Sequence, residues 1–175
     1  GTIALLHATG TLPAHPVYLA NGQMDQLVPG ALPTDWPTEQ LRAPTQVIFP
    51  AADGMPIHGQ LFLPPDYNPT DQYPAVLFFH GGSRRQMLLG FHHRGYYHNA
   101  FALNHYLAQQ GYIVLSVNYR SGIGYGLDFR EAPNYGATGA SEFNDVLGAG
   151  LYLRTREDVA DDQIGLWGGS YGGYL

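Results

Sequence analysis

Three apolar runs, separated by two segments with helical periodicity, constrain the fold of this chain more than any other feature. Residues 75–80 (AVLFFH) and 112–119 (YIVLSVNY) are continuous apolar runs, as expected for strands buried on both faces of a sheet. Residues 162–168 (DQIGLWG) form a third strand-like run. Helical patterns occupy residues 96–111 and 139–156, between the runs. This alternation predicts an α/β fold with a mostly parallel sheet and βαβ crossovers.

The second helical segment carries a start signal and an apolar side. Ser141 is the expected N-cap, because its hydroxyl can accept a hydrogen bond from a backbone N–H of the first turn. Five residues recur at helical spacing on one side, which predicts an amphipathic helix: Phe143, Val146, Leu147, Gly150 and Leu151.

The third apolar run leads directly into the motif G-x-S-x-G. Gly168-Gly169-Ser170-Tyr171-Gly172 follows a strand, as the sharp strand-to-helix turn of a serine nucleophile requires. Glycines before and after the serine remove Cβ atoms that would clash in such a turn. We therefore expect Ser170 to be a nucleophile and the N–H of Tyr171 to face a developing oxyanion.

A second glycine motif follows the first apolar run. His80-Gly81-Gly82-Ser83 stands where an α/β-hydrolase places its other oxyanion donor, in the loop after an early strand. The two glycines let the backbone approach a substrate carbonyl closely, and the N–H of Gly82 is the expected donor. Two motifs in this order, each after its own strand, favour a catalytic site over two ordinary glycine turns.

Three segments together resemble the prolyl oligopeptidase family of serine peptidases. They are HGG after one strand, NYRSGIGYG after the next, and GLWGGSYGGYL at the nucleophile turn. The similarity is greatest to the dipeptidyl-peptidase and acylaminoacyl-peptidase branches, and it covers residues 44–175. It implies Ser170 as nucleophile, with Tyr171 and the HGG loop as oxyanion donors. Many relatives carry Pro where this chain has Ser83, so the shape of this loop is one point of departure.

The resemblance also implies a domain organisation and a substrate class. Residues 44–175 would be the N-terminal part of an α/β-hydrolase (peptidase) domain. Residues 1–43, with short strand-like runs and a proline-rich connector, would be the last strands of a β-propeller and the linker. In this family the propeller precedes the hydrolase domain and screens its active site. The expected substrate is therefore a short peptide.

The histidines of the chain do not supply the expected general base. An α/β-hydrolase orders its triad as Ser, then Asp or Glu, then His, so the remaining triad members are expected after Leu175. The chain alone is expected to be inactive, and its folding alone is open because the strand before Ser170 would lack a neighbour. All eight histidines precede Ser170: His7, His15, His58, His80, His92, His93, His98 and His105.

Composition excludes several other functions. The net charge is −6 and no basic stripe is present, so nucleic-acid binding is not expected. There is no Cys, and no stretch approaches the roughly 20 apolar residues of a membrane span. The cluster His92, His93 and His98 matches no metal-ligand spacing. The segment Gly122-Ile-Gly124-Tyr-Gly126 has Leu127 where the dinucleotide fingerprint G-x-G-x-x-G requires its last glycine. We therefore expect neither a metal nor a cofactor.

Several alternatives remain open at this point. A serine turn cannot distinguish amide from ester substrates, so a carboxylesterase of the same fold is the first alternative. A non-catalytic binding module with a relic turn is the second. Arg120 and Glu142 could pair or contact substrate, although a solvated structural role is the expectation. The compartment is not indicated, and the full-length protein could form an oligomer.

Overall fold

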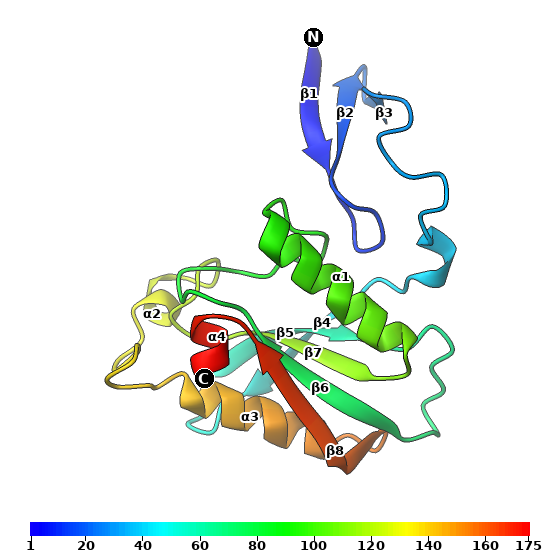
Figure 1. Ribbon diagram of the computed structural model, residues 1–175. Helices are drawn as coiled ribbons and strands as arrows, with labels where there is room; N and C mark the ends of the chain where they lie inside the picture. The colour runs from blue at the N-terminus through cyan, green and yellow to red at the C-terminus, as the bar shows by residue number, and fades with distance from the viewer.

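The computed structural model describes all 175 residues, which form two sheets (Figure 1). The smaller sheet is antiparallel, has the order β1-β2-β3, and lies at the N-terminus. Its strands are β1 (Thr2–His7), β2 (His15–Ala20) and β3 (Gln23–Gln26), and the short 3₁₀ helix η1 (Thr38–Gln40) follows them. The expected strand-like runs of residues 1–43 are therefore strands. That they belong to a β-propeller stays a prediction.

The larger sheet has five strands in the order β4-β5-β7-β6-β8. β6 pairs in parallel with both β7 and β8, whereas β5 pairs antiparallel with β4 and β7. The sheet is thus mixed rather than mostly parallel, because the hairpin at Asp53-Gly54 brings two antiparallel strands to one side. Its strands are β4 (Thr45–Pro50), β5 (Pro56–Phe62), β6 (Tyr73–Phe79), β7 (Ile113–Asn118) and β8 (Val159–Gly168).

Two helices cover opposite faces of this sheet, α1 (Gly95–Gln109) and α3 (Phe143–Arg154) (Figure 1). Every residue of β7 is buried, as its continuous apolar sequence predicts. Successive residues of β6 and β7 alternate between two apolar cores, one packed against each helix. The remaining helices are single turns, α2 (Leu127–Arg130) and α4 (Tyr171–Tyr174), and none of the helices has the length and hydropathy needed to span a bilayer.

Helix α3 differs from expectation at its start. It begins at Phe143, its N-cap position is Glu142, and no side chain caps it. Ser141 is therefore not the N-cap, and its buried hydroxyl has no hydrogen-bond partner. The chain before the helix turns through Ala140, which has a φ of 49°, and this turn moves the helix start past the serine.

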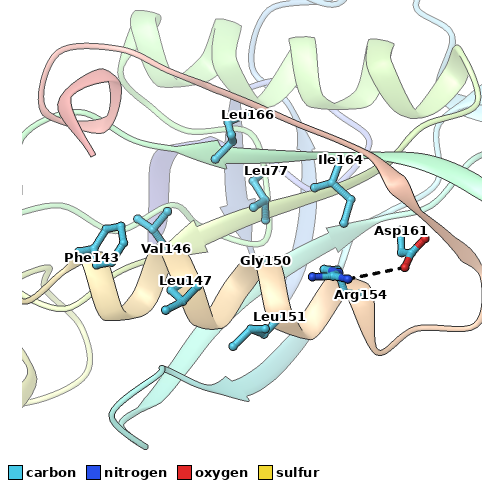
Figure 2. Close-up of a pocket in the computed structure, with 10 residues that line it drawn as sticks. All are labelled: Leu77, Phe143, Val146, Leu147, Gly150, Leu151, Arg154, Asp161, Ile164 and Leu166. Carbon is cyan, nitrogen blue, oxygen red and sulfur yellow. Dashed lines mark ion pairs between the residues drawn. The ribbon is translucent and has the colours of Figure 1, made fainter.

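The apolar side of α3 faces a groove rather than the core. Phe143, Leu147 and Leu151 remain between 44% and 57% exposed, whereas Ala149 and Leu153 on another side are fully buried. Figure 2 shows the groove between α3 and the edge strand β8, where Leu166 is also exposed. The predicted amphipathic pattern is present, but within these 175 residues β8 has a neighbour on one side only.

Candidate active site

Ser170 lies at the tip of a sharp turn between β8 and α4. Its side chain is exposed, and its backbone has a φ of 56° and a ψ of −123°. A non-glycine residue at positive φ is uncommon and costs about 1–3 kcal/mol, so it persists only where its surroundings impose it. This is the strained conformation that the G-x-S-x-G motif predicts. It places the exposed Ser170 just beyond the end of β8.

Close backbone packing below the turn imposes this conformation. A Cβ atom on Gly172 would overlap the carbonyl oxygen of Phe79 and lie 2.5 Å from that of His80. A Cβ atom on Gly168 would lie 2.5 Å from the carbonyl oxygen of Gly172. The glycines of the motif therefore let the turn sit directly against the end of β6.

The loop after β6 packs against the same turn. A Cβ atom on Gly81 would lie 3.1 Å from the Cβ atom of Ser170 and 2.8 Å from the carbonyl oxygen of Gly169. The loop is held from behind by two buried tyrosines. The hydroxyl of Tyr97 donates to the carbonyl of Gly81 at 2.9 Å, and that of Tyr119 donates to the carbonyl of His80 at 2.8 Å.

The structure thus brings together the two segments that carry the predicted site residues. Tyr171 is the first residue of α4, directly after Ser170. Gly82 is exposed, has a φ of +56°, and its N–H donates no hydrogen bond within the protein. An exposed, unpaired N–H directly after Gly81, which packs against Ser170, is a donor that a bound carbonyl oxygen could use.

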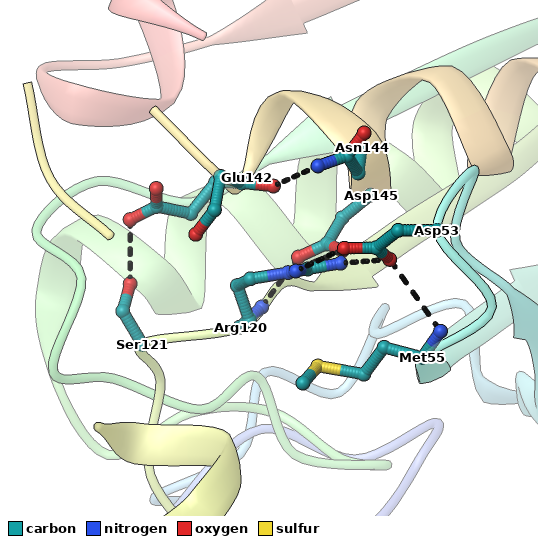
Figure 3. Close-up of polar contacts among 8 residues, drawn as sticks. Asp53, Met55, Arg120, Ser121, Glu142, Asn144 and Asp145 are labelled. Atoms are coloured by element: carbon teal, nitrogen blue, oxygen red, sulfur yellow. Dashed lines mark hydrogen bonds and ion pairs between the residues drawn. The ribbon is translucent and has the colours of Figure 1, made fainter. Parts of the chain in front are cut away.

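A buried carboxylate that sequence reasoning assigned to the surface supports the turn. Glu142 is fully buried, and its Oε1 accepts hydrogen bonds from the hydroxyls of Tyr171 at 3.0 Å and Ser121 at 2.8 Å. The N–H of Gly136 lies 3.1 Å from both of its carboxylate oxygens. Figure 3 shows the contact with Ser121. Burial, followed by the hydrogen bond to Glu142, raises the pKa of Tyr171 to about 12. The side chain of Tyr171 is therefore fixed as a donor.

Arg120 is buried beside this carboxylate but does not pair with it. Its guanidinium contacts Asp145 at 2.7 Å and Asp53 at 2.6 Å (Figure 3). Its backbone N–H also donates to Asp145 at 2.7 Å. The expectation of solvated roles for Arg120 and Glu142 is wrong, because each residue is at most 3% exposed and its side chain is hydrogen-bonded to partners within the protein. The network joins the end of β7, α3 and the β4–β5 hairpin.

His80 directly precedes Gly81, which packs against the nucleophile turn, yet the His80 ring is not placed as a general base. It is fully buried and stacks on Tyr119 with ring centroids 4.4 Å apart. Burial lowers the pKa of His80 to about 4, so the ring is neutral at pH 7. The hydrogen bonds that histidines make go to Pro13, Gln46, Gly81, Arg94 and Gly10, and none goes to Ser170.

The structure offers no preformed metal centre. No group of three or more His, Cys, Asp or Glu side chains is arranged to hold an ion. His92 and His93 stack on each other at 4.3 Å, and the backbone N–H of Arg94 donates to Nδ1 of His92 at 3.0 Å.

Comparison with known sequences gives one family. The model of the prolyl oligopeptidase family matches residues 99–175. Human dipeptidyl peptidase 8 is 37% identical over 128 residues, which are 73% of this chain and 14% of that relative. An uncharacterised peptidase of Bacillus subtilis (strain 168) is 30% identical over 172 residues, which are 96% of this chain and 25% of that relative. The chain therefore spans a quarter or less of the length of these curated relatives.

Solved structures share the fold over nearly the whole chain. A puromycin-hydrolysing peptidase of Mycobacterium tuberculosis superposes with a TM-score of 0.81 at 23% identity, covering 99% of this chain and 26% of that one. An acylaminoacyl peptidase of Pyrococcus horikoshii superposes with a TM-score of 0.72 at 26% identity, with the same coverage. The family match, these relatives and the shared fold show that the chain belongs to the prolyl oligopeptidase family.

Proposed function

We propose that the full-length protein is a serine peptidase that cleaves short peptides, with Ser170 as its nucleophile. One observation carries the proposal: an exposed serine at positive φ, between a strand and a helix, with the backbone of Gly81 packed against it. The names of the relatives support a peptide as substrate, since they include dipeptidyl and acylaminoacyl peptidases as well as a puromycin-hydrolysing peptidase.

The proposed reaction is acyl transfer in two steps. The Ser170 oxygen attacks the peptide carbonyl carbon, loses its proton to a general base, and forms a tetrahedral oxyanion. The oxyanion accepts hydrogen bonds from the N–H groups of Tyr171 and Gly82. The C–N bond then breaks, the base protonates the leaving amine, and an acyl-Ser170 ester remains. Water attacks this ester by the same route, which releases the acid and restores the hydroxyl.

The general base is the part that these 175 residues do not provide. No histidine in the chain hydrogen-bonds to Ser170. His80, the first residue of the His80-Gly81-Gly82 motif, is buried and stacks on Tyr119. A serine hydroxyl without a base is a poor nucleophile at neutral pH. We therefore propose that the 175-residue chain alone is inactive and that the full-length protein supplies the Asp and His.

The domain assignment follows the same reasoning. Residues 44–175 would form part of the hydrolase domain, since they contain the five-stranded sheet and both glycine motifs. Residues 1–43 would belong to a preceding β-propeller and its linker. Their three-stranded antiparallel sheet is consistent with one incomplete propeller blade.

A substrate panel tests the proposed function. The full-length protein is assayed with dipeptide p-nitroanilides bearing a free N-terminus, with N-acetylaminoacyl p-nitroanilides, and with p-nitrophenyl esters. We expect hydrolysis of at least one anilide, and Ser170→Ala should reduce kcat by more than about 10³-fold. Ser116→Ala is the matched control, because Ser116 is fully buried in β7 and its hydroxyl has no partner.

Each alternative has its own outcome in this panel. Ester hydrolysis that depends on Ser170, with no anilide or peptide hydrolysed, would favour a carboxylesterase. No turnover by a folded full-length protein would favour a binding module with a relic turn.

A further inference from the structure

A pocket beside the loop of residues 80–83 concentrates positive charge. Its volume is about 290 Å³. Three of the eight arginines of the chain line it together with two histidines, although the net charge of the chain is −6. No Asp or Glu lines it. The lining side chains are Arg84, Arg85, Gln86, Leu88, His92, His93, Arg94 and Ile123.

Arg85 connects this pocket to the proposed oxyanion loop. Its guanidinium lies over the ring of Tyr97, 4.7 Å from the ring centroid, and the hydroxyl of Tyr97 donates to the carbonyl of Gly81. The backbone N–H of Arg85 donates to the carbonyl of Ser83 at 2.7 Å. A Cβ atom on Gly82 would lie 3.3 Å from Nε of Arg85. The half-buried Arg85 is therefore held next to Gly82, the expected oxyanion donor.

The positive charge of this pocket is only partly compensated. Arg84 pairs with Glu131 at 2.7 Å, but Arg85 and Arg94 form no ion pair in the structure. Burial, followed by the neighbouring positive groups, lowers the pKa of His92, which is consistent with an excess of positive charge in the pocket. A half-buried guanidinium without an anionic partner attracts a carboxylate more strongly than a fully solvated one does.

We propose that this pocket is a subsite for a carboxylate of the peptide substrate, with Arg85 as its main contact and Arg94 as its second. The proposal rests on the proposed peptidase function and adds a substrate class to it. The planar guanidinium fork matches a carboxylate with two parallel hydrogen bonds. The carboxylate has two sources in a peptide, an acidic side chain or the free C-terminus.

Paired peptides test the proposal in the full-length protein. The first pair has the same sequence with a free C-terminal acid or a C-terminal amide. The second pair is amidated and carries Glu or Gln at one position, moved along the peptide. For each pair we define the preference as the kcat/KM of the carboxylate peptide divided by that of its neutral partner. We expect a preference of about tenfold in one pair, and the pair that shows it identifies the source of the carboxylate.

Arginine variants then locate the preference. Arg85→Gln and Arg94→Gln should each lower it at least about threefold. Arg42→Gln is the matched control, because Arg42 also lies over a tyrosine ring, 5.5 Å from the centroid of Tyr67. It should leave the preference unchanged, because Arg42 does not line the pocket. If Arg85→Gln fails to fold, as judged by circular dichroism, the exposed Arg94 still carries the test.

The outcomes separate this proposal from the proposed function. A preference near one in the wild type, or one that survives both Arg85→Gln and Arg94→Gln, overturns the subsite. If the peptides are nevertheless cleaved in a Ser170-dependent manner, the peptidase function stands. If no peptide is cleaved in a Ser170-dependent manner, both are overturned.

Discussion

Replacing Gly172 by alanine should disable the nucleophile turn without removing any polar group of the site. The added Cβ atom would overlap the carbonyl oxygen of Phe79 and lie 2.5 Å from that of His80. Both obstacles are backbone atoms at the end of β6, so neither can rotate away. The turn would have to move by about 1 Å, and a displacement of this size at a reacting group can cost about 10²-fold in rate. Overpacking of this kind also costs about 1–3 kcal/mol of stability.

The neighbouring Gly173 provides a matched control. A Cβ atom there would lie 3.4 Å from the carbonyl oxygen of Gly168, an ordinary contact, so Gly173→Ala should be tolerated. The assay is the second-order rate at which a fluorophosphonate phosphonylates Ser170 in the full-length protein, with fluoride as the leaving group, and the melting temperature is measured alongside. We expect Gly172→Ala to react about 100-fold more slowly than Gly173→Ala. Equal rates in two folded variants would refute the close packing of the turn against β6.

Two further predictions follow from buried groups near the turn. Tyr171→Phe removes one of the donors to the buried Glu142, and a hydrogen bond to a charged group contributes about 1.5–3 kcal/mol. We expect a clear fall in melting temperature and a phosphonylation rate about tenfold lower. Tyr174→Phe, which loses an exposed hydrogen bond to the carbonyl of Ala137, should change both little. Equal effects of the two substitutions would contradict the role of Glu142. Acid should destabilise the protein through His80. Burial lowers the pKa of His80 to about 4 in the folded state. As the pH falls from about 6.5 to 4, the unfolded state therefore binds a proton at this residue before the folded state does. This proton uptake costs about 3 kcal/mol of stability. Between pH 7 and pH 4.5, the urea midpoint of unfolding should fall further for the wild type than for His80→Phe. Equal falls would exclude His80 as the cause.

The sequence predicts the features of this fold that depend on local patterns. The apolar runs 75–80 and 112–119 are the central strands because a strand buried on both faces needs a continuous apolar sequence. The turn at Ser170 is legible because its glycines and serine are contiguous, and its positive φ is imposed by steric contacts that only glycine neighbours permit. Gly111, after the first helix, has a φ of +89° and ends it as such a residue commonly does.

Features that depend on distant parts of the chain could not be predicted. Glu142 reaches Tyr171 across 29 residues, and Arg120 reaches Asp53 across 67, so neither burial has a local signal. A charged residue is usually at the surface, so the sequence predicts a solvated role for both. Periodicity identified the apolar side of α3, but it does not show what covers that side, and here the side borders a groove.

The proposed peptidase function requires Ser170 to be an activated nucleophile in the full-length protein. The most direct measurement is labelling with a fluorophosphonate probe, with the modified peptide identified by mass spectrometry. The full-length protein, its Ser170→Ala variant and the 175-residue chain are compared under the same conditions. We predict that the full-length wild-type protein is labelled at Ser170 and that the other two samples are not labelled. A folded full-length protein that is not labelled, or is labelled equally after Ser170→Ala, would contradict the account.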